Sequence, residues 1–230
     1  MKRLARYSFY GGKNSGKTSV MSRVIKKLVD GGYRVAAVKH SRGEYTVDSE
    51  GTDTYKHAEA GAELVVFSTS IETSFILKEE LNINDILEVI ESIGISDVVL
   101  FEGYKDENLK GMDVSDRDTW NEENLDDIVC EIEDEINVFN ILNRLPFLDC
   151  GKCGYSTCEE MARAVIEGVV RLSDCTQNKS VILKVNRKPV QLTEFPANMI
   201  KNTVIGMIES LKGVDEVKDV SIDISAGDEI

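Results

Sequence analysis

Apolar and polar positions along the first part of the chain predict strands and helices that alternate. Five short apolar runs are typical of buried strands, at residues 4–10, 34–38, 64–67, 98–101 and 128–132. Apolar residues also recur every three or four positions after residue 17, over 83–93 and over 136–145, as they do on one face of a helix. We therefore expect an α/β domain with a doubly wound, mostly parallel sheet and right-handed crossovers.

The pattern changes after Pro146, which ends the last of these predicted helices. A short helical face at 159–168 is followed by two apolar runs, 181–185 and 190–192, around a polar turn that predicts a hairpin. A helix from Pro196 and an alternating run at 220–225 complete a small α+β unit of ββαβ order. These changes divide the chain into three predicted domains, at residues 1–146, 147–178 and 179–230.

A glycine-rich segment joins the first predicted strand to the first predicted helix. Its sequence fits the phosphate-binding pattern Gly-x4-Gly-Lys-[Ser/Thr] at every defined position. Glycines let backbone N–H groups face phosphate oxygens, and the helix N-terminus adds a favourable dipole. In such a loop Lys17 reaches the β- and γ-phosphates and the Thr18 hydroxyl binds Mg²⁺. The alternative is a glycine turn with a chance Lys-Thr pair. The predicted contacts to a nucleoside triphosphate are Gly11, Gly12, Lys13, Asn14, Ser15, Gly16, Lys17, Thr18 and Ser19.

Charged side chains follow two other predicted strands. The run 98–101 ends in Glu102, the expected form of the second nucleotide-site element, which holds Mg²⁺ through water or orients the attacking water. Lys39 and His40 end the run 34–38, and the polar stretch after them contains Asp53 as a candidate metal or water contact. Lys17, Glu102 and Asp53 are thus the predicted catalytic residues of a phosphoryl transfer to water. We expect slow turnover, because no arginine finger is identifiable in the sequence.

Four of the five cysteines lie between residues 150 and 175, with the spacing Cys-x2-Cys-x4-Cys-x16-Cys. Thiolates at this density favour zinc or an iron–sulfur cluster. A single helix over the last sixteen-residue interval would span about 24 Å, so the chain must reverse, with Gly168 and Ser173-Asp174 as candidate positions. The fifth cysteine, Cys130, is interpreted as a small buried residue of the strand at 128–132. The predicted metal ligands are Cys150, Cys153, Cys158 and Cys175.

Composition narrows the range of partners. The chain has 27 basic and 41 acidic residues and a net charge of -14, which argues against nucleic acid and anionic membranes as partners. No apolar stretch reaches the roughly 18 residues of a membrane span, and no signal peptide is readable. An odd number of cysteines does not suggest a disulfide framework. We expect a soluble, cytoplasmic protein.

Five further motifs follow the phosphate loop. They are Val38-Lys39-His40, Asp48, Gly51-Thr52-Asp53-Thr54-Tyr55, Ala60-Gly61-Ala62 and Val99-Leu100-Phe101-Glu102-Gly103-Tyr104-Lys105. In order and spacing, the loop and these motifs resemble the family of molybdopterin-guanine dinucleotide biosynthesis protein B (MobB). The resemblance covers about the first 145 residues.

The resemblance implies a P-loop NTPase fold, usually homodimeric, that binds GTP, hydrolyses it weakly and assists nucleotide attachment to the molybdenum or tungsten pterin cofactor. It implies that the pterin cofactor or its guanylyltransferase is a partner. It also places Asp53 and Glu102 near the metal or γ-phosphate. Lys39 and His40 would face the cleft, which makes them further predicted contacts to the nucleotide. The chain departs from the family at residues 41–44, where histidines are common. No Asn-Lys-x-Asp motif marks the guanine base, and Glu133-Asp134 is a candidate by position only.

The cysteine segment resembles the four-cysteine [4Fe-4S] domain of corrinoid iron–sulfur proteins and of some membrane electron-transfer subunits, over about 30 residues. The combined prediction is a GTP-binding accessory protein of molybdenum or tungsten cofactor biosynthesis that carries a [4Fe-4S] cluster. Two alternatives remain: a nucleotide-gated metallochaperone, and an iron–sulfur electron-transfer or redox-sensing protein. A small-molecule kinase is disfavoured, because no arginine-rich lid stretch is visible.

Overall fold

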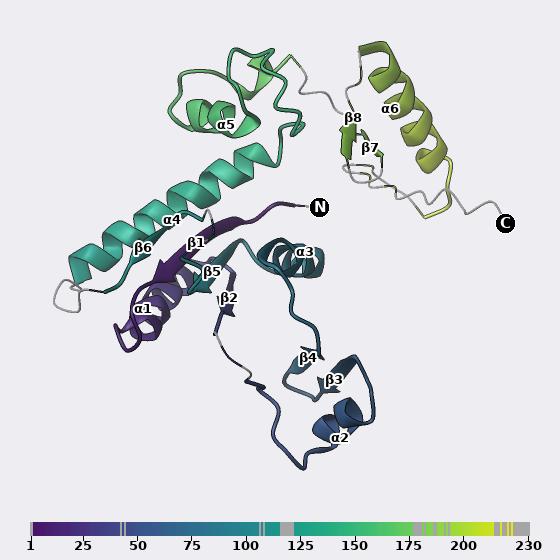
Figure 1. The fold of residues 1–230 in the computed structure, drawn as a ribbon. Helices are drawn as coiled ribbons and strands as arrows, with labels where there is room; N and C mark the ends of the chain where they lie inside the picture. Colours follow the sequence, from purple (N-terminus) through teal and green to yellow (C-terminus); the bar gives the residue numbers. More distant parts are fainter. Residues whose placement is uncertain are drawn as a thin grey trace. The chain divides into compact units, whose positions relative to one another are not determined.

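The computed structural model describes residues 2–41, 43, 45–105, 107, 109–115, 122–176, 181, 183–185, 188–190, 192, 194–213, 217, 220 and 222. The chain forms two compact units, Met1–Ile136 and Asn137–Ile230, each of which is described by itself (Figure 1). None of the helices in the described ranges is long and apolar enough to cross a membrane.

A parallel sheet of four strands forms the core of the first unit, in the order β2-β5-β1-β6. The central strands β1 (Ala5–Tyr10) and β5 (Val98–Glu102) are almost wholly buried, which explains their continuous apolar sequence. The outer strands are β2 (Val35–Lys39) and β6 (Gly111–Asp113). Because all four strands are parallel, their C-terminal ends meet at one edge of the sheet, where ligands bind in open α/β sheets.

Helices cover both faces of this sheet. The helix α1 (Lys17–Asp30) buries Val20, Met21, Val24 and Leu28 over the central strands. The helix α3 (Ile83–Ile93) has the predicted bounds and packs Ile83 and Leu87 against Val99 and Phe101 of β5. Asn82 caps α3 by accepting from the backbone N–H groups of Asn84 and Asp85. Figure 1 shows α1 and α3 on opposite sides of the sheet, so the predicted doubly wound α/β class is confirmed.

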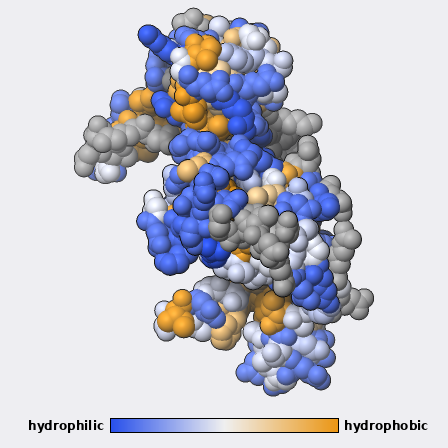
Figure 2. All heavy atoms as spheres, turned by 90° about the vertical axis from the view of Figure 1, so that its left-hand side faces the viewer, coloured by the Kyte–Doolittle hydropathy of each residue, from blue (hydrophilic) through white to orange (hydrophobic). Residues whose placement is uncertain are grey.

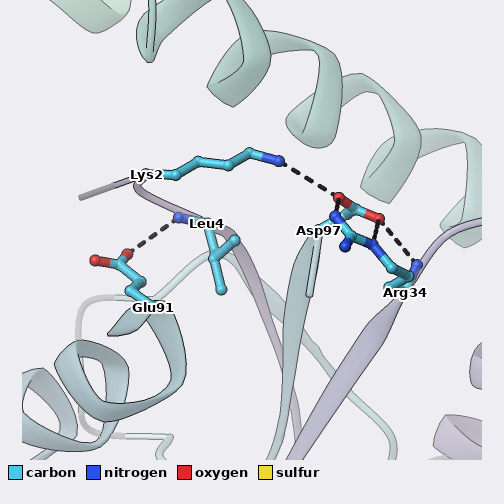
Figure 3. Close-up of polar contacts among 5 residues, drawn as sticks. All are labelled: Lys2, Leu4, Arg34, Glu91 and Asp97. Carbon is cyan, nitrogen blue, oxygen red and sulfur yellow. Dashed lines mark hydrogen bonds and ion pairs between the residues drawn. The ribbon is translucent and has the colours of Figure 1, made fainter. Parts of the chain in front are cut away.

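A cluster of charged residues joins three elements at the N-terminal edge of the sheet (Figure 3). Asp97 accepts hydrogen bonds from the Arg34 backbone N–H (3.0 Å), Nε (3.0 Å) and Nη2 (2.7 Å), and a longer one from Lys2 Nζ (3.4 Å). The backbone N–H of Leu4 donates to Glu91 Oε1 at 3.0 Å, which ties β1 to α3. The hydrogen bonds from Arg34 hold the pKa of Asp97 well below its usual range.

A separate two-stranded sheet follows β2 in the sequence. The predicted strand at 64–67 is confirmed as β3 (Leu64–Ser68), but it pairs antiparallel with β4 (Thr73–Leu77) and not with the main sheet. The pattern had not predicted β4. The short helix α2 (Asp53–Glu59) contacts β3 and begins at Thr52, whose hydroxyl accepts from the Tyr55 N–H.

One face of this hairpin is apolar and exposed. Directly opposed residues of an antiparallel pair point to the same side, so Leu64, Val66, Phe75 and Leu77 share a face. Each of these four side chains is at least 40% exposed, whereas Val65 on the other face is buried. Figure 2 shows apolar surface in the lower part of the view, where Figure 1 places β3 and β4. We call these four residues the hairpin face.

The predicted strand at 128–132 is wrong, because these residues lie in the long helix α4 (Glu122–Leu142). Leu125, Ile128, Ile132 and Ile136 are buried at three- to four-residue spacing, so the period of the whole segment outweighs the short β-branched run. The helix predicted at 136–145 is only the end of α4. Cys130 is exposed, so its interpretation as a buried residue is also wrong.

The second unit contains the cysteine segment and a small α+β part. The helix α5 (Cys158–Ile166) and the 3-10 turn η2 (Leu172–Asp174) are joined through Gly168, whose φ of 72° reverses the chain as expected. The predicted hairpin is confirmed by the antiparallel pair β7 (Leu183–Val185) and β8 (Lys188–Val190), and the predicted helix by α6 (Glu194–Glu209). The strand predicted at 220–225 falls largely outside the described residues.

Candidate functional site

The phosphate loop lies between β1 and α1, at the C-terminal edge of the sheet. Asn14 and Gly16 adopt left-handed backbone conformations, with φ of 62° and 91°. A Cβ atom on Gly11 would lie 3.1 Å from Ser15 Oγ, Asp113 Oδ1 and Ser115 Oγ, at a φ of 146° that favours glycine. Gly16 caps α1 without a side-chain hydrogen bond, so no side chain blocks the first N–H groups of the helix. Such a helix end suits an anion.

The ammonium group of Lys17 lies across this loop. Its Nζ donates to the backbone oxygens of Gly11 (3.0 Å) and Gly12 (2.5 Å), and to Ser15 Oγ at 3.4 Å. These acceptors are neutral, so phosphate oxygens would be stronger partners for the same charge. The positive charge of Lys17 is therefore held beside the open end of α1.

Thr18, Glu102 and Lys39 meet next to the loop, from α1, β5 and β2. The Thr18 hydroxyl lies 3.0 Å from both carboxylate oxygens of Glu102. Lys39 Nζ lies 3.2 Å from Glu102 Oε1. A hydroxyl beside a carboxylate is the oxygen donor set that Mg²⁺ prefers, so Thr18 and Glu102 fit the predicted metal site. Lys39 adds a positive charge to the same place.

His40 lies beside Glu102 and Lys39, where it makes a backbone hydrogen bond and a ring contact. Its backbone N–H donates to the Glu102 backbone oxygen at 3.0 Å, and its ring stacks on Tyr104 with centroids 4.7 Å apart. Tyr104 itself has a left-handed backbone, with a φ of 58°. His40 therefore sits at the edge of the site as a neighbour of Tyr104.

Asp53 is not brought to the loop. It begins α2, its side chain is 89% exposed, and in the described residues its carboxylate pairs with Lys56 at 3.1 Å. Glu133 and Asp134 lie inside α4, so the positional argument that placed them after a strand is wrong. Of the predicted carboxylates, Glu102 alone contacts the loop helix in the described part of the chain.

Two polar residues beside the loop were missed by sequence reasoning. Asp113 and Ser115 hydrogen-bond to each other and approach Gly11. Lys105 pairs with Asp113 at 3.7 Å, and the Ser115 hydrogen bond lowers the pKa of Asp113. They reach the loop because β6 pairs with the end of β1, and a strand of three residues leaves too short a pattern to detect.

The four predicted cysteine ligands all lie in the second unit. Cys158 and Cys175 are buried, and Cys150 and Cys153 are partly exposed. Phe147, Asp149, Gly151 and Gly154 all have left-handed backbones, so the segment before α5 is tightly wound. Asp149 Oδ1 accepts from the Cys158 N–H at 2.6 Å, and a capping box of Thr157 and Glu160 fixes the start of α5.

These thiols do not converge in the described structure. Among the described residues, which include all five cysteines, no three His, Cys, Asp or Glu groups are placed to hold a metal ion, and no cysteine forms a disulfide. Chemically, four thiols between residues 150 and 175 are a donor set that suits zinc or an iron–sulfur cluster. The ligand set stays a prediction.

Comparisons with known proteins match two families, each to a separate part of the chain. The family described as molybdopterin guanine dinucleotide synthesis protein B matches residues 7–134, and one described as "Putative Fe-S cluster" matches residues 145–177. A "Putative molybdopterin-guanine dinucleotide biosynthesis adapter protein" of Methanocaldococcus jannaschii is 31% identical over 229 residues, or 93% of this chain and 94% of its own.

Two further matches cover less of the chain. The molybdopterin-guanine dinucleotide biosynthesis adapter protein of Haemophilus influenzae is 31% identical over 98 residues, or 42% of this chain and 55% of its own. A crystal structure of Bacillus subtilis MobB has 22% identity and a TM-score of 0.43, covering 54% of this chain and 73% of its own. The fold and the loop define an α/β protein with a glycine loop after its first strand. The chain belongs to the molybdopterin guanine dinucleotide synthesis protein B family.

Proposed function

We propose that this chain is a cytoplasmic, GTP-binding accessory protein of molybdopterin guanine dinucleotide biosynthesis, acting on a molybdenum or tungsten pterin cofactor or with its guanylyltransferase. The names of its relatives support the pathway. The observation that carries the proposal is the convergence of Lys17, Thr18 and Glu102 at the glycine loop. We expect hydrolysis to be slow, because no arginine finger is identifiable in the sequence.

The residues have separate roles in this proposal. Lys17 leaves the backbone oxygens of Gly11 and Gly12 for the phosphates, and the N–H groups at the start of α1 bind phosphate oxygens. Thr18 and Glu102 hold Mg²⁺, which neutralises phosphate charge when it is bound. The alternative role for Glu102 is to orient the attacking water. Asp53 has no such contact here, so its predicted role at the metal is the least supported.

The test compares GTP affinity in wild-type protein and Lys17→Ala, by isothermal titration with Mg²⁺. We expect the substitution to weaken binding by about 10- to 100-fold, because a charge-assisted contact to phosphate is lost. Lys26→Ala, which removes an exposed lysine of α1 paired with Asp30, is the matched control and binds as wild type. Equal affinity in Lys17→Ala and wild type contradicts the loop assignment.

The pathway is tested by deleting the gene in its own host. Molybdenum or tungsten enzyme activity is then lost while other enzymes are unaffected. Normal maturation of those enzymes rejects the proposed pathway. In that case the second candidate gains support: an iron–sulfur electron-transfer or redox-sensing protein, or a metallochaperone gated by its nucleotide. What favours this alternative is that the four cysteines lie in a compact unit of their own.

We further propose that Cys150, Cys153, Cys158 and Cys175 hold a [4Fe-4S] cluster. The support is the match of residues 145–177 to the iron–sulfur family and the wound backbone before α5. A bound cluster would supply either one-electron chemistry or a covalent staple for the second unit. Zinc is the alternative metal for the same thiols.

We also propose that the chain is a homodimer joined through the hairpin face. A two-stranded sheet alone is marginally stable, and the hairpin face leaves four apolar side chains in water. A second copy presents the same apolar face, so the two faces are complementary about a twofold axis. Burial of both removes the exposed apolar surface of each.

A further inference from the structure

Lys39 and Glu102 are neighbours because of the sheet register. β2 and β5 run parallel, and the last residue of each pairs with the other in the register. Side chains at paired positions point to the same side of a sheet, so both reach toward the helix that begins at Lys17. The ion pair at 3.2 Å is therefore fixed by the fold rather than by a chance meeting of long side chains.

The two partners of this ion pair differ in burial. The Glu102 side chain is 12% exposed, whereas that of Lys39 is 64% exposed. A carboxylate withdrawn from water needs charge or hydrogen bonds in compensation. In the described residues Glu102 obtains a hydrogen bond from Thr18 and a positive charge from Lys39. The ammonium group of Lys39 is thus the positive charge that compensates Glu102 in this structure.

Thr18 is already arranged for a metal. Its hydroxyl donates its proton to Glu102, so the oxygen lone pairs are directed away from the carboxylate. Mg²⁺ can accept those lone pairs without breaking this hydrogen bond. Lys39 has the opposite effect on a metal ion, because its positive charge repels a cation at the Glu102 carboxylate.

We propose that Lys39 is a resident counter-ion of Glu102 that competes with Mg²⁺, so that binding of the Mg²⁺–nucleotide complex must release it. The inference rests on the proposed nucleotide-binding function and specifies how that site is regulated. It makes Lys39 a positioning residue that keeps Glu102 in place between rounds of binding.

A second lysine of the same sheet edge serves as the matched control. Lys105 is also 64% exposed and also pairs with a carboxylate, Asp113, at 3.7 Å. The side chain of Asp113 is 44% exposed, so water compensates for much of its charge. Removing the charge of Lys105 therefore changes the general electrostatics of the edge without touching Glu102.

The test is a Mg²⁺ titration of full-length protein at a fixed, subsaturating concentration of the fluorescent nucleotide mant-GTP. We expect Lys39→Met to lower the Mg²⁺ concentration at half-saturation by about fivefold, since the loss of an ion pair and of cation repulsion removes the competitor. Lys39→Arg retains the positive charge, so we expect its Mg²⁺ concentration at half-saturation to equal that of wild type. Lys105→Met also keeps the wild-type midpoint.

The outcomes separate this inference from the function on which it rests. A Mg²⁺ midpoint in Lys39→Met that is unchanged, or higher than in wild type, overturns the competition, and a higher midpoint means that Lys39 supports the metal. An equal decrease in Lys105→Met overturns it as well, because the effect is then general. If wild-type protein binds no mant-GTP, the proposed function fails, and the inference with it. Circular dichroism of each variant checks that it is folded.

Discussion

At the scale of single residues, two carboxylates near the two ends of β5 show how partners set a role. Asp97 lies just before the strand and is held by Arg34 with two side-chain hydrogen bonds and one from the backbone. Glu102 ends the strand and is held by one hydroxyl and one ammonium group. The first arrangement is a fixed, bidentate pair that aligns β2 with β5. The second arrangement, around Glu102, has one hydroxyl and one ammonium partner, which a metal or phosphate can replace.

We expect Asp97→Asn to lower the free energy of unfolding by about 1 to 3 kcal/mol at pH 7, because charge-assisted hydrogen bonds become neutral ones. The folded-state pKa of Asp97 lies below its ordinary value of 3.8, so its stabilisation is fully present above that value and is lost as pH falls through the folded pKa. Urea unfolding followed by circular dichroism should show a constant deficit from pH 7 to 5 that shrinks below pH 4.

Asp30→Asn is the control for this prediction. Asp30 pairs with Lys26 on the exposed side of α1, and surface pairs of this kind contribute about 0.5 kcal/mol or less. A deficit in Asp97→Asn that persists unchanged at pH 3 would show that the carboxylate charge is not its source.

The sequence predicts some site residues and not others for a physical reason. Lys17 and Thr18 belong to a local pattern whose geometry is set by neighbouring residues, and Glu102 ends a readable strand. Asp113 reaches the loop only through the register of β6 with β1, which no local pattern encodes. Asp53 fits a motif by spacing, yet its segment leaves the sheet with α2 and the hairpin.

At the scale of elements, the hairpin of β3 and β4 has the exposed apolar surface that a partner would cover. Its two faces differ in part: all four residues of the hairpin face are exposed, whereas on the other face Val65 is buried and Phe67 is 46% exposed. Alternate residues of each strand point to opposite faces of the hairpin. The face with more apolar residues, the hairpin face, is the one exposed to water. Exposed apolar patches of this kind mark interaction sites.

We expect Phe75→Asp to convert a homodimer into monomers, because the substitution places one charge per chain at the centre of the hairpin face. Sedimentation equilibrium at micromolar concentration measures the change. Ile71→Asp is the control, since Ile71 is 90% exposed at the turn and lies outside the hairpin face. Wild-type protein that sediments as a monomer, or a dimer that survives Phe75→Asp, rules out this interface.

The element α4 shows where local patterns mislead. Ile128-Val129-Cys130-Glu131-Ile132 has the β-branched content of a strand, and intrinsic preference alone favours that assignment. Burial decides otherwise, because the apolar positions that continue before and after this run keep the helical period. In contrast, α3 has both a clear period and terminal signals at Asn82 and Gly94, and its predicted bounds are confirmed.

At the scale of the whole molecule, the two chemistries occupy different units. The phosphate loop lies in Met1–Ile136, and the four clustered cysteines lie in Asn137–Ile230. Each unit has its own buried residues. This separation gives a direct test of the proposed cluster.

We expect protein purified without oxygen to contain about four iron atoms per chain, and Cys153→Ser to lose most of them while keeping its affinity for GTP. Iron analysis and the visible absorption of the cluster measure the loss. Cys130→Ser is the control, because this exposed cysteine of α4 lies outside the cluster set and its removal leaves the iron in place. One zinc atom per chain, without iron, would reject the cluster.

The helix α4 has a consequence for how the protein can be divided. It runs from Glu122 to Leu142, so its backbone hydrogen bonds cross the boundary between residues 136 and 137. Proteases cleave backbone that is extended in their active sites, and helical backbone does not adopt that conformation. We therefore expect limited digestion to leave the chain intact between residues 136 and 137. Separate expression of the part that contains the phosphate loop therefore requires a chain that keeps α4 to its end.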